Sequence, residues 1–132
     1  MRATLSPAFV FRSPLANTRE ARHCFPPSSE CDSTGLIDPV YEYGRDEGKS
    51  ITGGFVATNG RIPAIQNHYV FGDFVSGRLW AIPLPTDRNG PLVKAISLGQ
   101  WPFLPSTFGQ SHDGTLFVAD FGKGSVYRLD PA

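Results

Sequence analysis

A strand, turn and strand pattern occurs twice in this sequence, at an offset of 47 residues. The first copy is YVFGDFVSGRLWAI at residues 69–82, and the second is LFVADFGKGSVYRL at residues 116–129. Six positions match in register, including Asp73 with Asp120 and Gly77 with Gly124. A repeat of about 40 to 50 residues built from short strands is typical of β-propeller blades. The sequence therefore predicts an all-β fold made of repeated units.

Each copy carries the residues that a tight hairpin requires. The aspartate can accept a hydrogen bond from the backbone amide two residues on, which starts a turn. The glycine can adopt the positive φ that closes the hairpin. We therefore interpret Asp73 and Asp120 as turn-forming rather than catalytic residues. The flanking runs are almost continuously apolar, as expected for strands buried between neighbouring blades. Two unrelated hairpins in another all-β fold are the alternative.

Further segments complete the predicted units. Residues 50–56 are expected to form the inner strand of the first unit, and Leu92 to Leu98 its outer strand. A short strand is also expected at Val40 to Tyr43. Only three strands are expected in the second unit, at residues 106–110, 116–119 and 126–129. Its missing outer strand is expected from the other end of the polypeptide, or from Phe9 to Phe11. An unpaired last strand would also favour self-association.

The length of the chain bounds how much of a propeller it can hold. A unit of 47 residues fits fewer than three times into 132 residues, whereas closed propellers have roughly four to eight blades. We therefore expect residues 23–132 to be the C-terminal blades of a longer propeller that needs upstream blades. Residues 1–22 are a poorly defined N-terminal segment. Its apolar patch is too short and too broken for the core of a signal peptide.

Composition excludes several classes of partner. Twelve basic and twelve acidic residues give a formal net charge of zero, and no Lys/Arg cluster stands out. This argues against nucleic acid and anionic membranes, whose binding relies on clustered cations. No apolar stretch approaches the roughly 20 residues that span a bilayer.

The two cysteines, Cys24 and Cys31, lie in a polar loop that is rich in proline and serine. Their even number favours a disulfide, which implies an oxidising compartment, over a pair of reduced thiols. A metal site is a weaker alternative, since His23 is beside Cys24 but no second pair of ligands is spaced for it.

Small and polar residues at the start of the first inner strand are the candidate ligand contacts. Inner strands line the central channel of a propeller, where small residues let backbones approach closely. Lys49, Ser50 and Thr52 could face a cofactor or other ligand at the channel mouth. The alternative is that they serve only close packing.

Four segments resemble, in order, the C-terminal end of the glucose/sorbosone dehydrogenase family. They are HCFPPSSECDSTGLIDPVYEYG, SITGGFV, YVFGDFVSGRLWAI and TFGQSHDGTLFVADFGKGSVYRL. This family contains soluble quinoprotein sugar dehydrogenases and hedgehog-interacting-protein-like proteins. The similarity runs from about Arg19 to Leu129, and its cysteine pair resembles a Cys-loop of this branch, which supports the disulfide.

The resemblance implies a partial six-bladed β-propeller with about two blades of four-stranded antiparallel sheet. It also implies pyrroloquinoline quinone (PQQ), often calcium, oxidation of the C1 hydroxyl of an aldose sugar by the complete protein, and a secreted or periplasmic location. The segment alone is expected to be inactive. The alternative is a non-catalytic propeller that binds carbohydrate or protein. The positions at which family members hold the quinone with one Lys and two Arg correspond here to Val75 and, approximately, Leu104 and Ser106.

Overall fold

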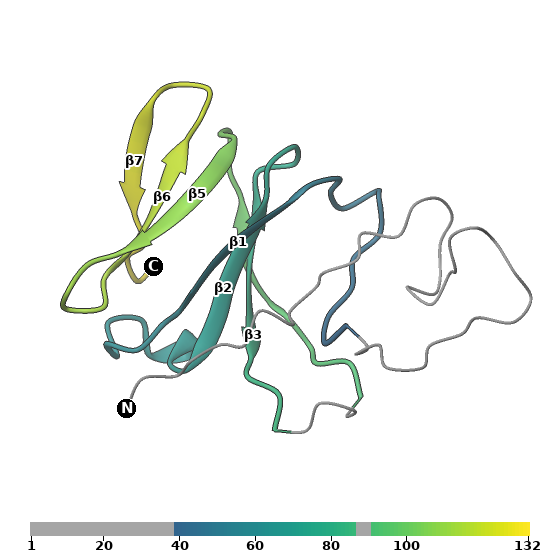
Figure 1. The fold of residues 1–132 in the computed structure, drawn as a ribbon, viewed down its shortest axis with the longest axis vertical. Coiled ribbons are helices and arrows are strands. Elements are labelled where there is room, and N and C mark those ends of the chain that lie inside the picture. Colours follow the sequence, from purple (N-terminus) through teal and green to yellow (C-terminus); the bar gives the residue numbers. More distant parts are fainter. Residues whose placement is uncertain (1–38, 87–90) are drawn as a thin grey trace, which may run out of the picture.

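The computed structural model describes residues 39–86 and 91–132, which form two antiparallel sheets (Figure 1). Sheet 1 has the strand order β1-β2-β3-β4, and sheet 2 has the order β5-β6-β7. Their bounds are β1 (Ile51–Val56), β2 (His68–Asp73), β3 (Arg78–Pro83), β4 (Ile96–Gln100), β5 (Pro105–Gln110), β6 (Leu116–Asp120) and β7 (Ser125–Arg128). A 3-10 turn, η1 (Pro63–Ile65), lies between β1 and β2. The all-β prediction is confirmed.

Several predictions fall on residues that the structure does not describe. They are the N-terminal segment 1–22, the Cys24–Cys31 disulfide and the possible strand from Phe9 to Phe11.

Both predicted hairpins form, and their turns use the predicted residues. Asp73 ends β2, and its Oδ1 accepts hydrogen bonds from the amides of Val75 and Ser76 at 3.0 and 2.8 Å. Gly77 closes that turn with a φ of 71°, and Gly124 closes the second turn with a φ of 64°. A side chain would strain the backbone at either glycine, which explains why both copies have glycine there.

The predicted strand at Val40 to Tyr43 is wrong. This segment crosses the face of sheet 1 and forms no strand. The Tyr43 ring stacks on Trp80 with a centroid distance of 4.8 Å, and the Val40 carbonyl accepts a hydrogen bond from the Val93 amide. The apolar residues therefore cover a sheet instead of extending one. A chain that lies on a face cannot form a ladder of backbone hydrogen bonds.

The outer strand β4 begins and ends later in the sequence than predicted. The expected range was Leu92 to Leu98, but β4 spans Ile96–Gln100. Gln100 pairs with Arg78 at the start of β3, and its side-chain amide donates to the Ser76 carbonyl at 3.0 Å. These contacts near the hairpin extend the pairing beyond the apolar run, which explains the shift.

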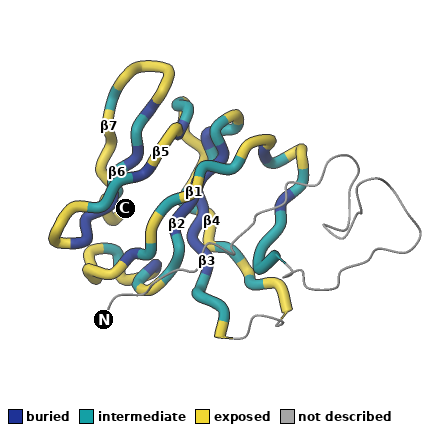
Figure 2. The backbone as a smooth tube through the Cα atoms, viewed as in Figure 1, coloured by how far each residue is buried: buried dark blue, intermediate teal, exposed yellow. Residues whose placement is uncertain are grey.

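The main core lies between the two sheets. Val70 and Leu79 of sheet 1 cluster with Phe108, Leu116 and Val118 of sheet 2, and all five are buried. Figure 2 shows buried backbone where the sheets meet and exposed backbone along most of β7. Burial of large aliphatic and aromatic side chains is the main stabilising contribution to such an interface.

The opposite face of sheet 1 carries a second cluster. Phe71, Trp80 and Ile82 pack there with Tyr43. Phe71 and Trp80 are stacked with a centroid distance of 5.5 Å. Both faces of sheet 1 are thus covered, which agrees with the nearly continuous apolar sequence of β2 and β3.

The first strands of the two sheets, β1 and β5, are neighbours in space. Thr52 Oγ1 donates to the Pro105 carbonyl at 2.6 Å near one end, and Gln110 Nε2 donates to the Val56 carbonyl at 2.9 Å near the other. Because contacts progress from the start to the end of both strands, β1 and β5 run in the same direction. The sheets are therefore joined by hydrogen bonds along their first strands as well as by the core.

Equivalent faces of the two sheets are both covered, each by a different part of the chain. The offset of 47 residues matches Phe71 with Val118 and Trp80 with Tyr127. Val118 and Tyr127 are paired across β6 and β7, and Val118 is part of the core between the sheets. The face of sheet 2 that packs on sheet 1 is therefore equivalent to the face of sheet 1 that Tyr43 covers.

Candidate functional site

The structure places Lys49, Ser50 and Thr52 at the end of sheet 1 where the β2–β3 hairpin turns. The backbone amides of Lys49 and Ser50 each donate to Asp73 Oδ2 at 2.6 Å, while their side chains are exposed. The Thr52 hydroxyl is engaged by the Pro105 carbonyl of sheet 2. Lys49 and Ser50 are thus beside each other on the surface, whereas Thr52 faces the neighbouring sheet. Their role in ligand binding stays a prediction.

Asp73 is the polar centre of this end of the sheet. It is fully buried, and Tyr43 Oη donates to its Oδ2 at 2.8 Å in addition to the Lys49 and Ser50 amides. Burial alone would raise the pKa of Asp73, but the hydrogen bonds from Ser76, Tyr43, Ser50 and Lys49 outweigh it and hold the pKa below the ordinary value. Asp73 is therefore an ionised structural anchor whose oxygens are occupied by donors.

Asp120 repeats this arrangement with fewer partners. Its Oδ1 accepts from the Leu104 and Gly122 amides at 3.0 and 2.9 Å, and the Leu104 hydrogen bond is the main cause that lowers its pKa. Its Oδ2 is buried and accepts no hydrogen bond. No side chain in the described part of sheet 2 takes the place that Tyr43 has beside Asp73.

Exposed aromatic residues surround the β2–β3 hairpin. Phe74 contacts Phe121 of the β6–β7 turn edge to face at 5.9 Å, and Phe121 is 71% exposed. On another side, the Trp101 amide donates to the Gly77 carbonyl at 3.0 Å, and Trp101 is 49% exposed. The Phe74 amide donates to the Ser50 carbonyl at 2.7 Å. We call the exposed residues gathered here the hairpin-end surface: Lys49, Ser50, Val75, Trp101 and Phe121.

Trp101 and Phe121 were not predicted as site residues. A signal for Phe121 existed, because a phenylalanine follows the repeated aspartate in both copies. Trp101 had no such signal, since it lies in the connection between the two repeats. Its place beside Gly77 depends on a backbone contact between segments that the repeat does not include.

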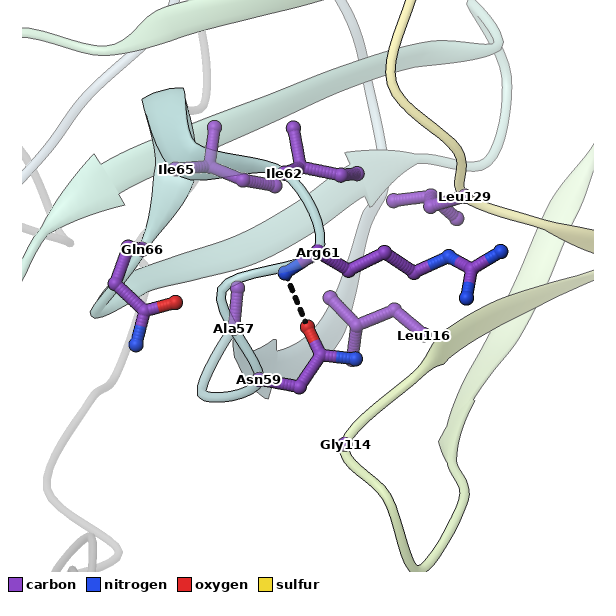
Figure 3. A pocket seen from close by; sticks show the side chains of 9 residues that line it. All are labelled: Ala57, Asn59, Arg61, Ile62, Ile65, Gln66, Gly114, Leu116 and Leu129. Carbon is purple, nitrogen blue, oxygen red and sulfur yellow. Dashed lines mark hydrogen bonds between the residues drawn. The ribbon is translucent and has the colours of Figure 1, made fainter.

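A small pocket lies between the sheets, away from the hairpin-end surface (Figure 3). Arg61 and Asp130 form an ion pair of 2.8 Å beside it. Gln66 Oε1 is buried and has no hydrogen-bond partner, while the amide nitrogen donates to the Thr58 carbonyl at 3.1 Å. The pocket has room for a molecule about the size of water, and Gln66 Oε1 is one buried acceptor available to it. Its lining residues are Ala57, Asn59, Arg61, Ile62, Ile65, Gln66, Gly114, Leu116 and Leu129.

The residues at the expected quinone positions do not fit PQQ. Val75 is an exposed apolar side chain in the hairpin, the Leu104 amide is used by Asp120, and Ser106 Oγ donates to the Ala119 carbonyl. A tricarboxylate needs cationic partners, which none of the three provides. For calcium, no group of three or more His, Cys, Asp or Glu within residues 39–86 and 91–132 could hold a metal ion.

Comparison with known proteins adds no family assignment. No protein-family model matches the chain, and no solved structure matches its fold. The resemblance to the glucose/sorbosone dehydrogenase family therefore stays a prediction. In the part of the chain that the structure describes, no helix is long and apolar enough to cross a membrane.

Proposed function

We propose that this chain supplies two neighbouring blades of a β-propeller of the glucose/sorbosone dehydrogenase type, and that these blades bind carbohydrate without catalysing its oxidation. The observation that carries the proposal is the hairpin-end surface, where the exposed Trp101 and Phe121 rings and the exposed Lys49 and Ser50 are arranged around one hairpin, β2–β3. The expectation that the protein is secreted or periplasmic belongs to the same proposal and rests on the family resemblance.

The packing of the two sheets supports the propeller arrangement. Each sheet is a meander that begins with the strand nearest its neighbour, and the first strands β1 and β5 run side by side in the same direction. Neighbouring blades around a central channel have this relation. The repeated hairpins lie in separate sheets, as successive blades require.

The chemistry of the hairpin-end surface favours a sugar as the ligand. Exposed rings such as those of Trp101 and Phe121 offer apolar faces against which the C–H face of a sugar can pack. Ser50 can donate to and accept from hydroxyl groups, and Lys49 can donate to them. The Trp101 indole N–H already donates to the Leu98 carbonyl at 3.0 Å, which fixes the ring in place.

The catalytic alternative, PQQ-dependent oxidation of an aldose at C1, lacks supporting residues here. The positions that would hold the quinone carry Val75, Leu104 and Ser106. Their chemistry favours the binding role, and the two roles can be separated by one set of titrations.

The test uses the two tryptophans, because Trp101 is half-exposed whereas Trp80 is buried. The chain is titrated with glucose and with a linear glucose hexasaccharide while iodide quenching of tryptophan fluorescence is measured. We expect the sugar to protect Trp101 from iodide, with a dissociation constant on the order of 1 mM. Phe121→Ala is expected to weaken binding by about tenfold. Leu92→Ala, which changes an exposed apolar residue outside the surface, is the matched control and leaves the affinity unchanged.

Iodide quenching that no sugar alters would exclude the carbohydrate role. A parallel titration with PQQ separates the alternatives, because tight quinone binding that survives Phe121→Ala would favour the dehydrogenase alternative.

A further inference from the structure

No further sheet packs on the outer face of sheet 2 within the residues that the structure describes. This face, which points away from sheet 1, consists of Thr107, Gly109, Phe117, Ala119, Val126 and Arg128. Val126 is 68% exposed, although it lies within β7 and pairs with Ala119 of β6, which has Phe117 on the same face. An exposed β-branched residue on an edge strand is a common feature of surfaces that bind another sheet.

The first unit shows what covers this face when the repeat continues. At the offset of 47 residues, Leu79 corresponds to Val126 and Val70 to Phe117. Leu79 is 4% exposed and Val70 is fully buried, because sheet 2 packs over them. The same positions that bind the next sheet in the first unit are therefore open in the second.

The first strands give a second, independent indication. Thr52 pairs with Gly72 and Thr107 pairs with Ala119, which corresponds to Gly72 at the offset of 47, so Thr52 and Thr107 have equivalent places. The Thr52 hydroxyl bonds to sheet 2 at 2.6 Å, whereas Thr107 is exposed and its hydroxyl makes only a 3.3 Å contact with the Phe108 carbonyl of its own strand. Thr107 is thus placed to donate to the first strand of another sheet.

We infer that the outer face of sheet 2 binds a further antiparallel sheet of this same repeat, in the relation that sheet 2 has to sheet 1. The partner packs apolar residues equivalent to Phe108 and Val118 over Val126 and Phe117, and its first strand accepts a hydrogen bond from Thr107. A strand equivalent to β4 precedes that sheet and pairs with β7. In sheet 1, β4 pairs with β3 in this manner.

A second copy of the chain does not meet this requirement. In sheet 2, the face that would have to dock, which carries Phe108 and Val118, is already packed on sheet 1. In sheet 1 it is covered by the segment that contains Val40, Tyr41 and Tyr43. The partner is therefore a sheet whose equivalent face is bare. The inference rests on the proposed propeller arrangement but does not depend on the carbohydrate ligand, so failure of one does not imply failure of the other.

The repeat itself supplies the probe. Residue 132 corresponds to residue 85 at the offset of 47, so a second copy of residues 86–132 joined after Ala132 continues the repeat in register. In this extended chain we expect hydrogen exchange of the β7 amides to slow by at least tenfold relative to the natural chain. We also expect the urea midpoint of unfolding to rise and the strand content to increase.

Paired substitutions show whether the outer face is responsible. Val126→Asp leaves the midpoint of the natural chain unchanged because Val126 is exposed, but it removes the added protection in the extended chain. Leu92→Asp, a similar change at a residue that is 53% exposed and lies outside both surfaces, affects neither chain.

Three results would overturn the inference. One is an extended chain without additional strand content. Another is added strand content with unchanged exchange at β7. The third is concentration-dependent protection of β7 in the natural chain, which would assign the face to a second copy.

Discussion

Asp73 and Asp120 occupy equivalent turns but differ in how completely their carboxylates are hydrogen-bonded. Both Asp73 oxygens accept donors, including the Tyr43 hydroxyl, whereas Asp120 Oδ2 accepts none. The repeat predicts the shared turn-forming role, because the aspartate, the phenylalanine after it and the glycine four residues on recur. It does not predict the difference, because Tyr43 comes from a segment outside the repeated hairpin.

Asp73→Asn is expected to destabilise the protein more than Asp120→Asn. The amide nitrogen that replaces one carboxylate oxygen in Asp73→Asn cannot accept hydrogen bonds, so at least one set of buried donors loses a charged acceptor. We expect a loss of about 2–3 kcal/mol for Asp73→Asn. In Asp120→Asn the nitrogen can occupy the place of the unpartnered Oδ2, so the loss is smaller. Urea unfolding of both variants measures this difference, and equal losses would contradict the role assigned to Tyr43.

The lowered pKa of Asp73 also predicts how stability depends on pH. A carboxylate whose folded pKa lies below the ordinary value of 3.8 stabilises the fold fully above that value. This contribution is lost as the pH falls through the folded pKa. The free energy of unfolding is therefore expected to be flat near neutral pH and to fall below about pH 4. Asp73→Asn should make that fall shallower, while Asp113, with a pKa of about 2, Asp120 and Asp130 maintain the remaining slope. An unchanged slope would contradict the assignment.

The two turn glycines provide a matched test of strain against crowding. Gly77 and Gly124 both have positive φ, but an added Cβ at Gly77 would overlap the Trp101 carbonyl, whereas nothing lies within 4 Å at Gly124. We expect Gly124→Ala to cost about 1 kcal/mol from backbone strain alone. Gly77→Ala should cost about 3 kcal/mol or more, because it also displaces the connection before β5. Thermal unfolding of both variants checks the order. Equal shifts in Tm would show that Trp101 does not lie against the hairpin.

At the scale of elements, strands with strong local signals were predicted well. Hairpins β2–β3 and β6–β7 follow from apolar runs bounded by turn residues, and the inner strands β1 and β5 follow from small residues at the place where each repeat begins. The predictions for Val40 to Tyr43 and for the start of β4 failed. An apolar pattern shows that a segment is buried, but it does not show whether the segment pairs at a sheet edge or lies across a face.

The contact between the first strands predicts unequal effects for two equivalent hydroxyls. Thr52→Val removes the 2.6 Å hydrogen bond to the Pro105 carbonyl and leaves that carbonyl without this donor. We expect a loss of about 1 kcal/mol. Thr107→Val removes only a long contact at an exposed position and should change stability by less than about 0.5 kcal/mol in the natural chain. Comparing urea midpoints tests this, and a larger effect at Thr107 would reverse the proposed order of the sheets.

At the scale of the whole molecule, the sequence repeat predicts units but not their relation. The matching of Leu79 with Val126 gives no reason for one to be buried and the other exposed. That difference depends on which sheet comes next, and it follows only from the packing. The candidate site was likewise predicted only in part. The sequence predicts Lys49 and Ser50 as ligand contacts, but it does not predict Trp101 and Phe121, which reach the hairpin through tertiary contacts with Gly77 and Phe74.

The central claim is that the two hairpins belong to successive sheets packed face to face, and methyl NOE spectroscopy of the natural chain tests it most directly. The account predicts NOEs from the Val70 and Leu79 methyl groups to Phe108 and Val118, since all four residues share the core between the sheets. Absence of these NOEs, together with NOEs that place β3 beside β6 in one continuous sheet, would contradict the claim.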